Sequence, residues 1–450
     1  MTGSAPARSF VPLTGADCFL RAFDHEIRRM NGASHVSQLV LRLGPGFDIE
    51  RFGRVIEEAA RAQPLLRAPV ARRFGLGPPV FRLAAAARRP MPRVEVHEAP
   101  APRDGDPPLP ALFSGRLNEP RSLRRGELLR FDVVRYAGGA AGVDLAASWL
   151  HLLFDGAGSE RFVRWLDECY RGERSVAELP DPAETNVLAS PKPSFAERGR
   201  CAQAWQRWHD AMAARPPSSL AGLLRRTPQA LRYGVDSFSA QETARIVDTA
   251  RRRAGFLTPM LFYLAAALRA HHAVFRARGS EPRSYVVPLP VNLRPKGGEG
   301  AIFRTHVSLL WFQVLPEQLE DFDGLIGALK EQRVAAIRAG QIENGVHAMD
   351  FARFAPRRLY TYLARRTLGG ELCSFFFAFT DGFLPGLKSF FGAEIRNGFH
   401  VPPVPPSPGS CIAMSLRENR LNATHVHQRG VFSERELAIF DERLRADLLA

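Results

Sequence analysis

Several features that mark other protein classes are scarce or missing in this chain of 450 residues. The five cysteines are far apart, odd in number and without a CxxC pair, which argues against a disulfide framework and a zinc knuckle. The first twelve residues lack the apolar core of a signal peptide. The longest apolar stretch, residues 260–268, is far shorter than the roughly 20 residues that span a bilayer. We therefore expect a cytoplasmic protein without a transmembrane segment, and peripheral association with a membrane stays open.

Lysine is also scarce, because four of the 61 basic residues are lysines and the other 57 are arginines. The formal net charge is +15, spread along the chain in short pairs. A bias towards arginine on solvated faces is the simpler interpretation. The functional one is an affinity for anionic groups, such as a CoA phosphate, an acidic carrier protein or lipid headgroups. No recognised module for nucleic acid accompanies the charge, so we expect no such partner.

Familiar catalytic and metal-binding patterns are missing as well. The chain has no P-loop, no GxGxxG and no GxSxG elbow around Ser159. His271 and His272 are adjacent on a predicted helix and so face different directions, whereas His425 and His427 share a strand face without an evident third ligand. The sequence predicts no metal site.

What is present is an ordinary globular composition, 45% hydrophobic and 24% charged, and enough length for two lobes with a core each. Hydrophobic periodicity predicts alternating strands and helices in both halves. The predicted strands cover 36–43, 129–136, 143–151, 284–289, 307–314, 373–380, 411–417 and 421–426, and the main helices cover 48–62, 158–170, 239–252, 258–275, 322–338 and 433–449. This order favours an α/β or α+β fold of two similar lobes, residues 1–175 and 236–450, joined by a crossover linker over 176–235 that holds a short helix near 201–214.

The most informative motif is His151-Leu152-Leu153-Phe154-Asp155-Gly156, at the turn from a predicted strand to a predicted helix. His151 ends the strand on the same face as Trp149 and can take a proton. Asp155 can orient the turn, and Gly156 lets the chain turn where a side chain would clash. This arrangement suits acyl transfer, in which a base deprotonates a hydroxyl or amine as it attacks. Taken alone, His151 would more often be a packed histidine and Asp155 an ordinary helix cap.

Four segments in order carry a family likeness: PLTGADCFL at 12–20, QPLLR at 63–67, the HxxxDG motif at 151–156, and PVNLRP at 290–295. With them the chain resembles the superfamily of CoA-dependent acyltransferases. That superfamily includes chloramphenicol acetyltransferase, the condensation domains of peptide synthetases, and the bacterial wax ester synthases/diacylglycerol acyltransferases.

The resemblance implies two lobes, each a sheet flanked by helices, with a tunnel between them and His151 in mid-tunnel as general base. The donor would be an acyl-CoA or acyl carrier protein thioester, and the acceptor the hydroxyl or amine of a small molecule or lipid, with no metal or organic cofactor. It also implies that Asp155 pairs with Arg294 and does not itself act as base. Asn292 and Trp149 are candidates for the tunnel wall.

Some positions depart from the pattern. Leu150 stands where many relatives have a first histidine, residues 303–306 read Phe-Arg-Thr-His in place of a Gly-Asn pair, and residues 379–382 lack a Ser/Thr-Asn pair. A catalytically silent module that docks a carrier protein or lipid is therefore the alternative function. The aromatic run at 375–383 fits either a tunnel wall or, more commonly, core.

Overall fold

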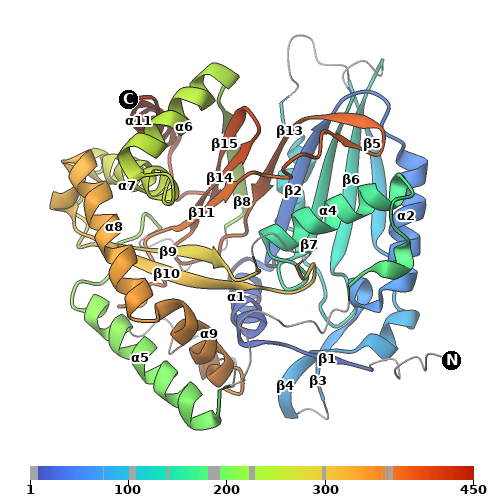
Figure 1. Cartoon of the computed structure of the whole chain (residues 1–450), viewed down its shortest axis with the longest axis horizontal. Coiled ribbons are helices and arrows are strands. Elements are labelled where there is room, and N and C mark those ends of the chain that lie inside the picture. Colours follow the sequence, from blue (N-terminus) through green and yellow to red (C-terminus); the bar gives the residue numbers. More distant parts are fainter. Residues whose placement is uncertain are drawn as a thin grey trace.

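The computed structural model describes residues 9–73, 76–100, 108–138, 142–180, 193–221, 229–295, 300–356 and 368–450, with residues 358, 359 and 362. Parts of the predicted linker (181–192 and 222–228) lie outside the described residues. Two lobes stand side by side, with the N-terminal lobe on the right and most of the C-terminal half on the left in Figure 1. The predicted fold class, an α/β build of two lobes, is confirmed.

The first lobe is built on a six-stranded sheet in which only β5 and β6 are parallel. Its strands, in spatial order, are β12 (Ser389–Phe390), β13 (Ala393–Val401), β2 (Val36–Leu43), β7 (Val143–Leu150), β6 (Leu129–Tyr136) and β5 (Arg93–Ala99). Helices α2 (Ile49–Ala62), α3 (Ala111–Arg116) and α4 (Gly156–Tyr170) accompany it, with a small sheet of β1 (Val11–Pro12), β4 (Leu76–Phe81) and β3 (Val70–Arg73). Apolar side chains on α2 and on both faces of the sheet form the core of this lobe.

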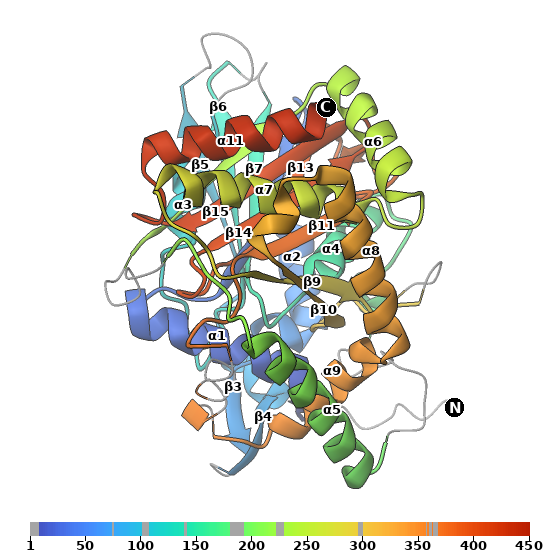
Figure 2. The same cartoon turned by 90° about the vertical axis from the view of Figure 1, so that its left-hand side faces the viewer.

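The second lobe has a four-stranded sheet in the order β11 (Phe376–Asp381), β14 (Ser410–Arg417), β15 (Arg420–Gln428) and β8 (Leu231–Ser237). Helices α7 and α11 lie across its outer face (Figure 2). The helices of this half are α5 (Phe195–Ala213), α6 (Ala240–Ala254), α7 (Met260–Ala277), α8 (Phe322–Arg338), α9 (Gln341–Ala352) and α11 (Glu434–Leu449). A two-stranded ribbon of β9 (Tyr285–Asn292) and β10 (Val307–Val314) reaches towards the first lobe (Figure 1). None of the described helices combines the length and apolarity needed to cross a membrane.

The chain does not divide at a single point, and this corrects the predicted boundaries in detail. Residues 389–401, expected in the second lobe, form β12 and β13 of the first lobe's sheet, since β13 pairs with β2. Strand β8 begins at Leu231, inside the predicted linker, and joins the second sheet. The linker also carries α5, a full 19-residue helix that packs on α9.

A helix that the periodicity did not predict, α1 (Gly15–Asn31), lies at the junction of the lobes (Figure 1). Thr14 and Asp17 form a capping box at its start, which fixes where the helix begins. The residues in the helix that are buried include Asp17, Asp24 and Glu26, so polar residues interrupt the apolar stripe.

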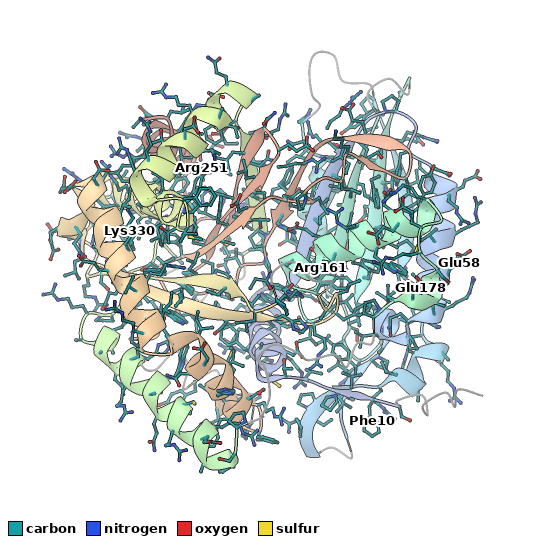
Figure 3. All side chains as sticks on the ribbon, viewed as in Figure 1. Phe10, Glu58, Arg161, Glu178, Arg251 and Lys330 are labelled. Atoms are coloured by element: carbon teal, nitrogen blue, oxygen red, sulfur yellow. The ribbon has the colours of Figure 1, made fainter. Side chains whose placement is uncertain are left out.

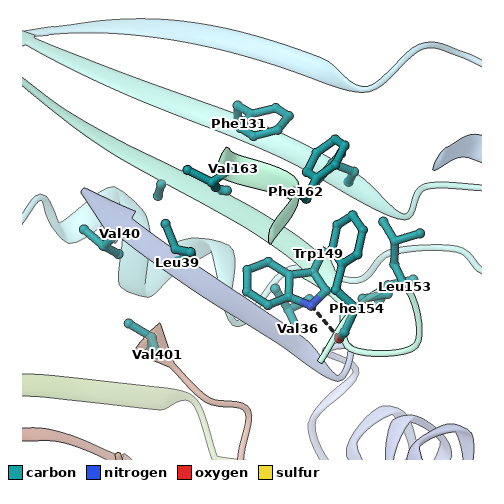
Figure 4. Packing of buried hydrophobic residues seen from close by; sticks show 14 of the residues in the cluster. Val36, Leu39, Val40, Phe131, Trp149, Leu153, Phe154, Phe162, Val163 and Val401 are labelled. Atoms are coloured by element: carbon teal, nitrogen blue, oxygen red, sulfur yellow. Dashed lines mark hydrogen bonds between the residues drawn. The ribbon is translucent and has the colours of Figure 1, made fainter. Parts of the chain in front are cut away.

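Trp149 lies in the hydrophobic core of the first lobe. Its side chain is fully buried, and its indole nitrogen donates to the carbonyl of Phe154 over 3.0 Å (Figure 4). The aromatic run of the second half is also core where it is most buried, at Phe375, Phe377 and Phe383. Trp149, a candidate for the tunnel wall, therefore packs in the apolar cluster of the first lobe.

A candidate active site at the junction of the lobes

The HxxxDG motif forms a turn that both halves of the chain hold in place. Strand β7 ends at Leu150 and α4 begins at Gly156, with Asp155 as its N-cap. The backbone N–H of His151 donates to the carbonyl of His35 over 2.9 Å. From the second half, the N–H of Arg304 donates to the carbonyl of Leu153 over 2.7 Å. The turn therefore lies where the lobes meet.

The half-buried His151 side chain is fixed in one orientation. Its Nδ1 lies 3.0 Å from the carbonyl oxygen of Phe154. Because a carbonyl only accepts, Nδ1 carries the proton and Nε2 keeps the lone pair. Burial lowers the pKa of His151, although the Phe154 carbonyl and Asp155 act the other way. The ring is thus neutral near pH 7, with a basic nitrogen available.

Asp155 and Arg294 form the predicted pair between the two halves. The Arg294 Nη1 donates to Oδ2 of Asp155 over 2.8 Å, and the two side chains are only 2% and 3% exposed, respectively. Asp155 also accepts the N–H groups of His306 (2.7 Å, Oδ2) and Gly158 (2.8 Å, Oδ1). Burial opposes ionisation, but Arg294 and the N–H of His306 hold the pKa of Asp155 below its usual range.

The Asp155–Arg294 pair is not bidentate, since only one hydrogen bond, from Nη1 of Arg294, reaches the carboxylate. The Nε of Arg294 donates instead to the carbonyl of Ala301 over 2.7 Å. Asn292 accepts from Nη1 of Arg294 over 3.2 Å and from its backbone N–H over 3.1 Å. Asn292 is itself exposed. The residue therefore positions Arg294, and its predicted place on a tunnel wall is not seen.

Of the two glycines that follow Asp155, the one the turn requires is Gly158. A Cβ on Gly158 would lie 2.3 Å from the carbonyl oxygen of Ile302, so the second half packs directly on the backbone there. A Cβ on Gly156 would meet the His400 ring at 3.5 Å, an ordinary contact. The steric role assigned to Gly156 from the sequence thus belongs to Gly158. Figure 3 shows Arg161, on the next turn of α4, at the same junction.

A second buried ion pair ties the opening segment of the chain to residues 303–306. Arg304 donates from Nε and Nη2 to Oδ2 of Asp17, over 3.1 and 2.9 Å, and the two side chains are at most 3% exposed. Arg304 has a φ of 75°, in the left-handed region that favours glycine. The arginine thus occupies a glycine-like backbone position, and its side chain gains a buried partner. Sequence reasoning noted both segments but gave no sign that they meet.

A small cavity beside His151 contains a second histidine that the sequence reasoning missed. The cavity, of about 10 Å³, is lined by His151, His35 and Leu150 with side chains of α1. The two imidazole centres lie 5.3 Å apart. Burial, and then the charge of His151, lower the pKa of His35 well below its usual value. In the sequence, the one sign of this role is that His35 directly precedes the predicted strand at 36–43.

Another pair of titratable groups, His400 and Glu160, lies at the start of α4. The His400 Nε2 is 3.3 Å from the Ser159 hydroxyl and 3.7 Å from the Glu160 carboxylate. Burial raises the pKa of Glu160 to about 8, and burial followed by the charge of His151 lowers that of His400 to about 4. Glu160 also accepts the N–H of Leu384 over 2.9 Å, so it anchors the crossing from β11 to β12.

One group within the described residues has the spacing of a metal site: Glu95, His97 and Asp132. Its carboxylates already bind arginines, because Arg116 lies 2.8 Å from Asp132 and 3.1 Å from Glu95. Ion pairing accounts for this cluster. His425 and His427 pack with their ring centres 5.0 Å apart, and Ser410 bridges His425 to His271.

Comparison with known proteins gives structural neighbours only. No family model matches the sequence, and no curated protein does either. The first condensation domain of the calcium-dependent antibiotic synthetase, in complex with a substrate analogue, has a TM-score of 0.69 at 17% identity, covering 98% of this chain and 96% of that one. The trichothecene 15-O-acetyltransferase TRI3 of Fusarium sporotrichioides has a TM-score of 0.67 at 13% identity, covering 100% and 96%.

A third neighbour is the epimerization domain from the third module of tyrocidine synthetase B, with a TM-score of 0.60 at 15% identity, covering 100% of this chain and 98% of that one. At these identities the likeness concerns the fold, which several chemistries share. The chain therefore has the same fold as these condensation domains and this acetyltransferase, which is the fold that the resemblance of its four motifs implied.

Proposed function

We propose that the protein transfers an acyl group from a thioester donor, an acyl-CoA or acyl carrier protein, to a hydroxyl or amine acceptor. The observation that carries this proposal is the state of His151. Its Nδ1 is held by the Phe154 carbonyl, its Nε2 is available, and its turn is clamped by Asp155 and Arg294. An oriented neutral imidazole is what a general base requires.

In the proposed mechanism Nε2 of His151 accepts the proton of the acceptor as its oxygen or nitrogen attacks the thioester carbonyl. The C–S bond then breaks, and His151 returns the proton to the departing thiolate. General base work of this kind contributes roughly 10²–10⁴-fold, and holding both substrates in line supplies most of the rest. Asp155 keeps the turn in place and stays ionised, because its carboxylate is committed to Arg294 and two backbone N–H groups.

A silent binding module is the second candidate. The observation in its favour is the small cavity beside His151, which at about 10 Å³ holds about one water. Its lining side chains would have to separate to admit an acceptor. One observation argues against the silent module. Although residues 303–306 lack the Gly-Asn pair of many relatives, the backbone N–H of Arg304 still donates to the turn that carries His151.

The test is thiol release from acetyl-, octanoyl- and palmitoyl-CoA and from acyl carrier protein thioesters, each with alcohol and amine acceptors. Acyl transfer predicts thiol release that depends on the acceptor, and a product with the mass of donor acyl plus acceptor. Binding of a thioester without any acceptor-dependent release would favour the silent module.

We also propose a cytoplasmic location, in keeping with five free cysteines. Retention in the membrane fraction after high-salt and carbonate washing would contradict it.

A further inference from the structure

One buried histidine beside the candidate base has no part in the mechanism proposed above. The ring centre of His35 lies 5.3 Å from that of His151, and both residues line the cavity of about 10 Å³. His35 is only 4% exposed. Within the described part of the chain, neither ring nitrogen of His35 has a hydrogen-bond partner. A buried imidazole without a partner costs stability, so its presence calls for a reason other than packing.

Two other buried histidines show how such a ring is usually held. The Nδ1 of His271 lies 2.9 Å from the carbonyl oxygen of Ala267. The Nε2 of His306 lies 3.0 Å from the carbonyl oxygen of Phe303. Burial lowers the pKa of His35 well below its usual value, so its ring is neutral near pH 7 and offers one N–H donor and one lone pair. Both remain unused by the described residues, and this sets His35 apart.

The backbone fixes His35 beside the candidate base. Its carbonyl accepts the N–H of His151 over 2.9 Å, and its own N–H donates to Oδ1 of Asp24 over 3.1 Å. The ring also meets the edge of Phe23, with 5.7 Å between the ring centres. A hydrogen bond between their own backbones therefore holds the two imidazoles close together.

His35 and His151 are the neutral hydrogen-bonding side chains of this cavity. Four of its eight lining residues are leucines, and Asp24 already accepts from Nε of Arg28 over 2.6 Å. Arg21 has a partner of its own. A cavity of this volume has room for about one water, which is the size of a single attacking oxygen or nitrogen. An atom placed there would have both imidazoles within its surroundings.

We propose that His35 is a second catalytic residue, which hydrogen-bonds the attacking atom of the acceptor while Nε2 of His151 takes its proton. The inference rests on the proposed function. The acceptor oxygen or nitrogen bonds to the acyl carbon, the C–S bond breaks, and His151 returns the proton to the thiolate, so His35 neither gains nor loses a proton. An amine can donate its second N–H to the lone pair of His35, and an alcohol can accept the ring N–H. Either contact holds the attacking atom against the base.

The kinetic test compares three substitutions of His35 on the thioester and acceptor pairs of the thiol-release panel. His35→Phe keeps a buried ring and removes its hydrogen bonding, whereas His35→Asn and His35→Gln place an amide near the positions of Nδ1 and Nε2. We expect His35→Phe to lower kcat/KM for the acceptor roughly 10-fold, as the loss of one hydrogen bond does, with little change in the KM of the thioester. At least one amide variant should recover most of the loss.

Unfolding in urea separates this role from packing. Because the His35 ring has no partner to lose, His35→Phe should unfold at an equal or higher urea concentration than wild type. The matched control is His271→Phe in the core of the second lobe, which loses the bond to Ala267. This control should unfold at a lower urea concentration and keep its kcat/KM. If His35→Phe does not fold, His35→Leu takes its place.

A folded His35→Phe or His35→Leu with normal kcat/KM would overturn the proposal. Equal losses in the Phe, Asn and Gln variants would also overturn it, because hydrogen bonding would then not be what the ring contributes. A loss of the same size in His271→Phe would do so too, since any core substitution would then have this effect. If wild type releases no thiol in response to any acceptor, the proposed function fails and the role of His35 with it, whereas an active wild type with an equally active His35→Phe removes the role of His35 alone.

Discussion

Removing the carboxylate of Asp155 should cost more stability than removing both members of its ion pair. The Asp155→Ala change leaves the Arg294 guanidinium 2% exposed and without its counter-charge, and it orphans the N–H groups of His306 and Gly158. Breaking a buried pair in this way costs roughly 3–5 kcal/mol. Arg294 keeps its bonds to Ala301 and Asn292, so we expect a value near the lower end, about 3 kcal/mol.

Urea unfolding of four proteins measures this: wild type, Asp155→Ala, Arg294→Met and the double variant, all at pH 7.5. The double variant should be more stable than Asp155→Ala, because no unpaired charge remains. The pKa of Asp155 is lowered in the folded protein, so its contribution is present above the unfolded value of about 3.9 and is lost only as pH falls through the folded pKa. The cost should therefore be unchanged at pH 5. A cost of Asp155→Ala below about 1 kcal/mol, or a double variant less stable than either single one, would refute the reasoning.

Three further predictions concern the same turn and the buried histidines. Because burial lowers the pKa of His151, the acidic inflection in the pH profile of kcat/KM should lie below about pH 6.5. An inflection above pH 7 would contradict a base that is neutral at pH 7. Gly158→Ala should lower the unfolding free energy by roughly 1–3 kcal/mol in urea titrations, since its Cβ would lie 2.3 Å from the Ile302 carbonyl oxygen, and equal costs for Gly156→Ala would count against this account. Burial lowers the pKa of His271 to about 3 and of His400 to about 4, so the unfolded chain binds more protons below about pH 6.5; stability should fall from pH 6.5 to 4, and a flat profile would speak against these rings being neutral.

Local sequence signals predicted most elements of the fold. Strand β2 and helix α2 came out with nearly the observed bounds, since each has a clear period and α2 has Asp48 as its cap. Ser433 and Glu436 form the predicted capping box of α11. These features are local, because a cap and an apolar stripe require only neighbouring residues.

The parts that escaped prediction depend on long-range contacts. Strand β13 joins the first sheet by pairing with β2, more than 350 positions away in the chain, and no local pattern specifies that partner. The same holds for the pair between Asp17 and Arg304 and for the placement of His35 beside His151. The Asp155–Arg294 pair was predictable only through the family likeness.

The central claim is that Nε2 of His151 is the general base of an acyl transfer, and a single-turnover measurement on His151→Ala tests it most directly. The variant would be compared with wild type on whichever thioester and acceptor pair the panel identifies, after circular dichroism has shown that both are folded. The account predicts that the rate of product formation falls by roughly 10²-fold or more, with donor binding retained. A variant that is folded, binds the donor and forms product at a near-normal rate would contradict it.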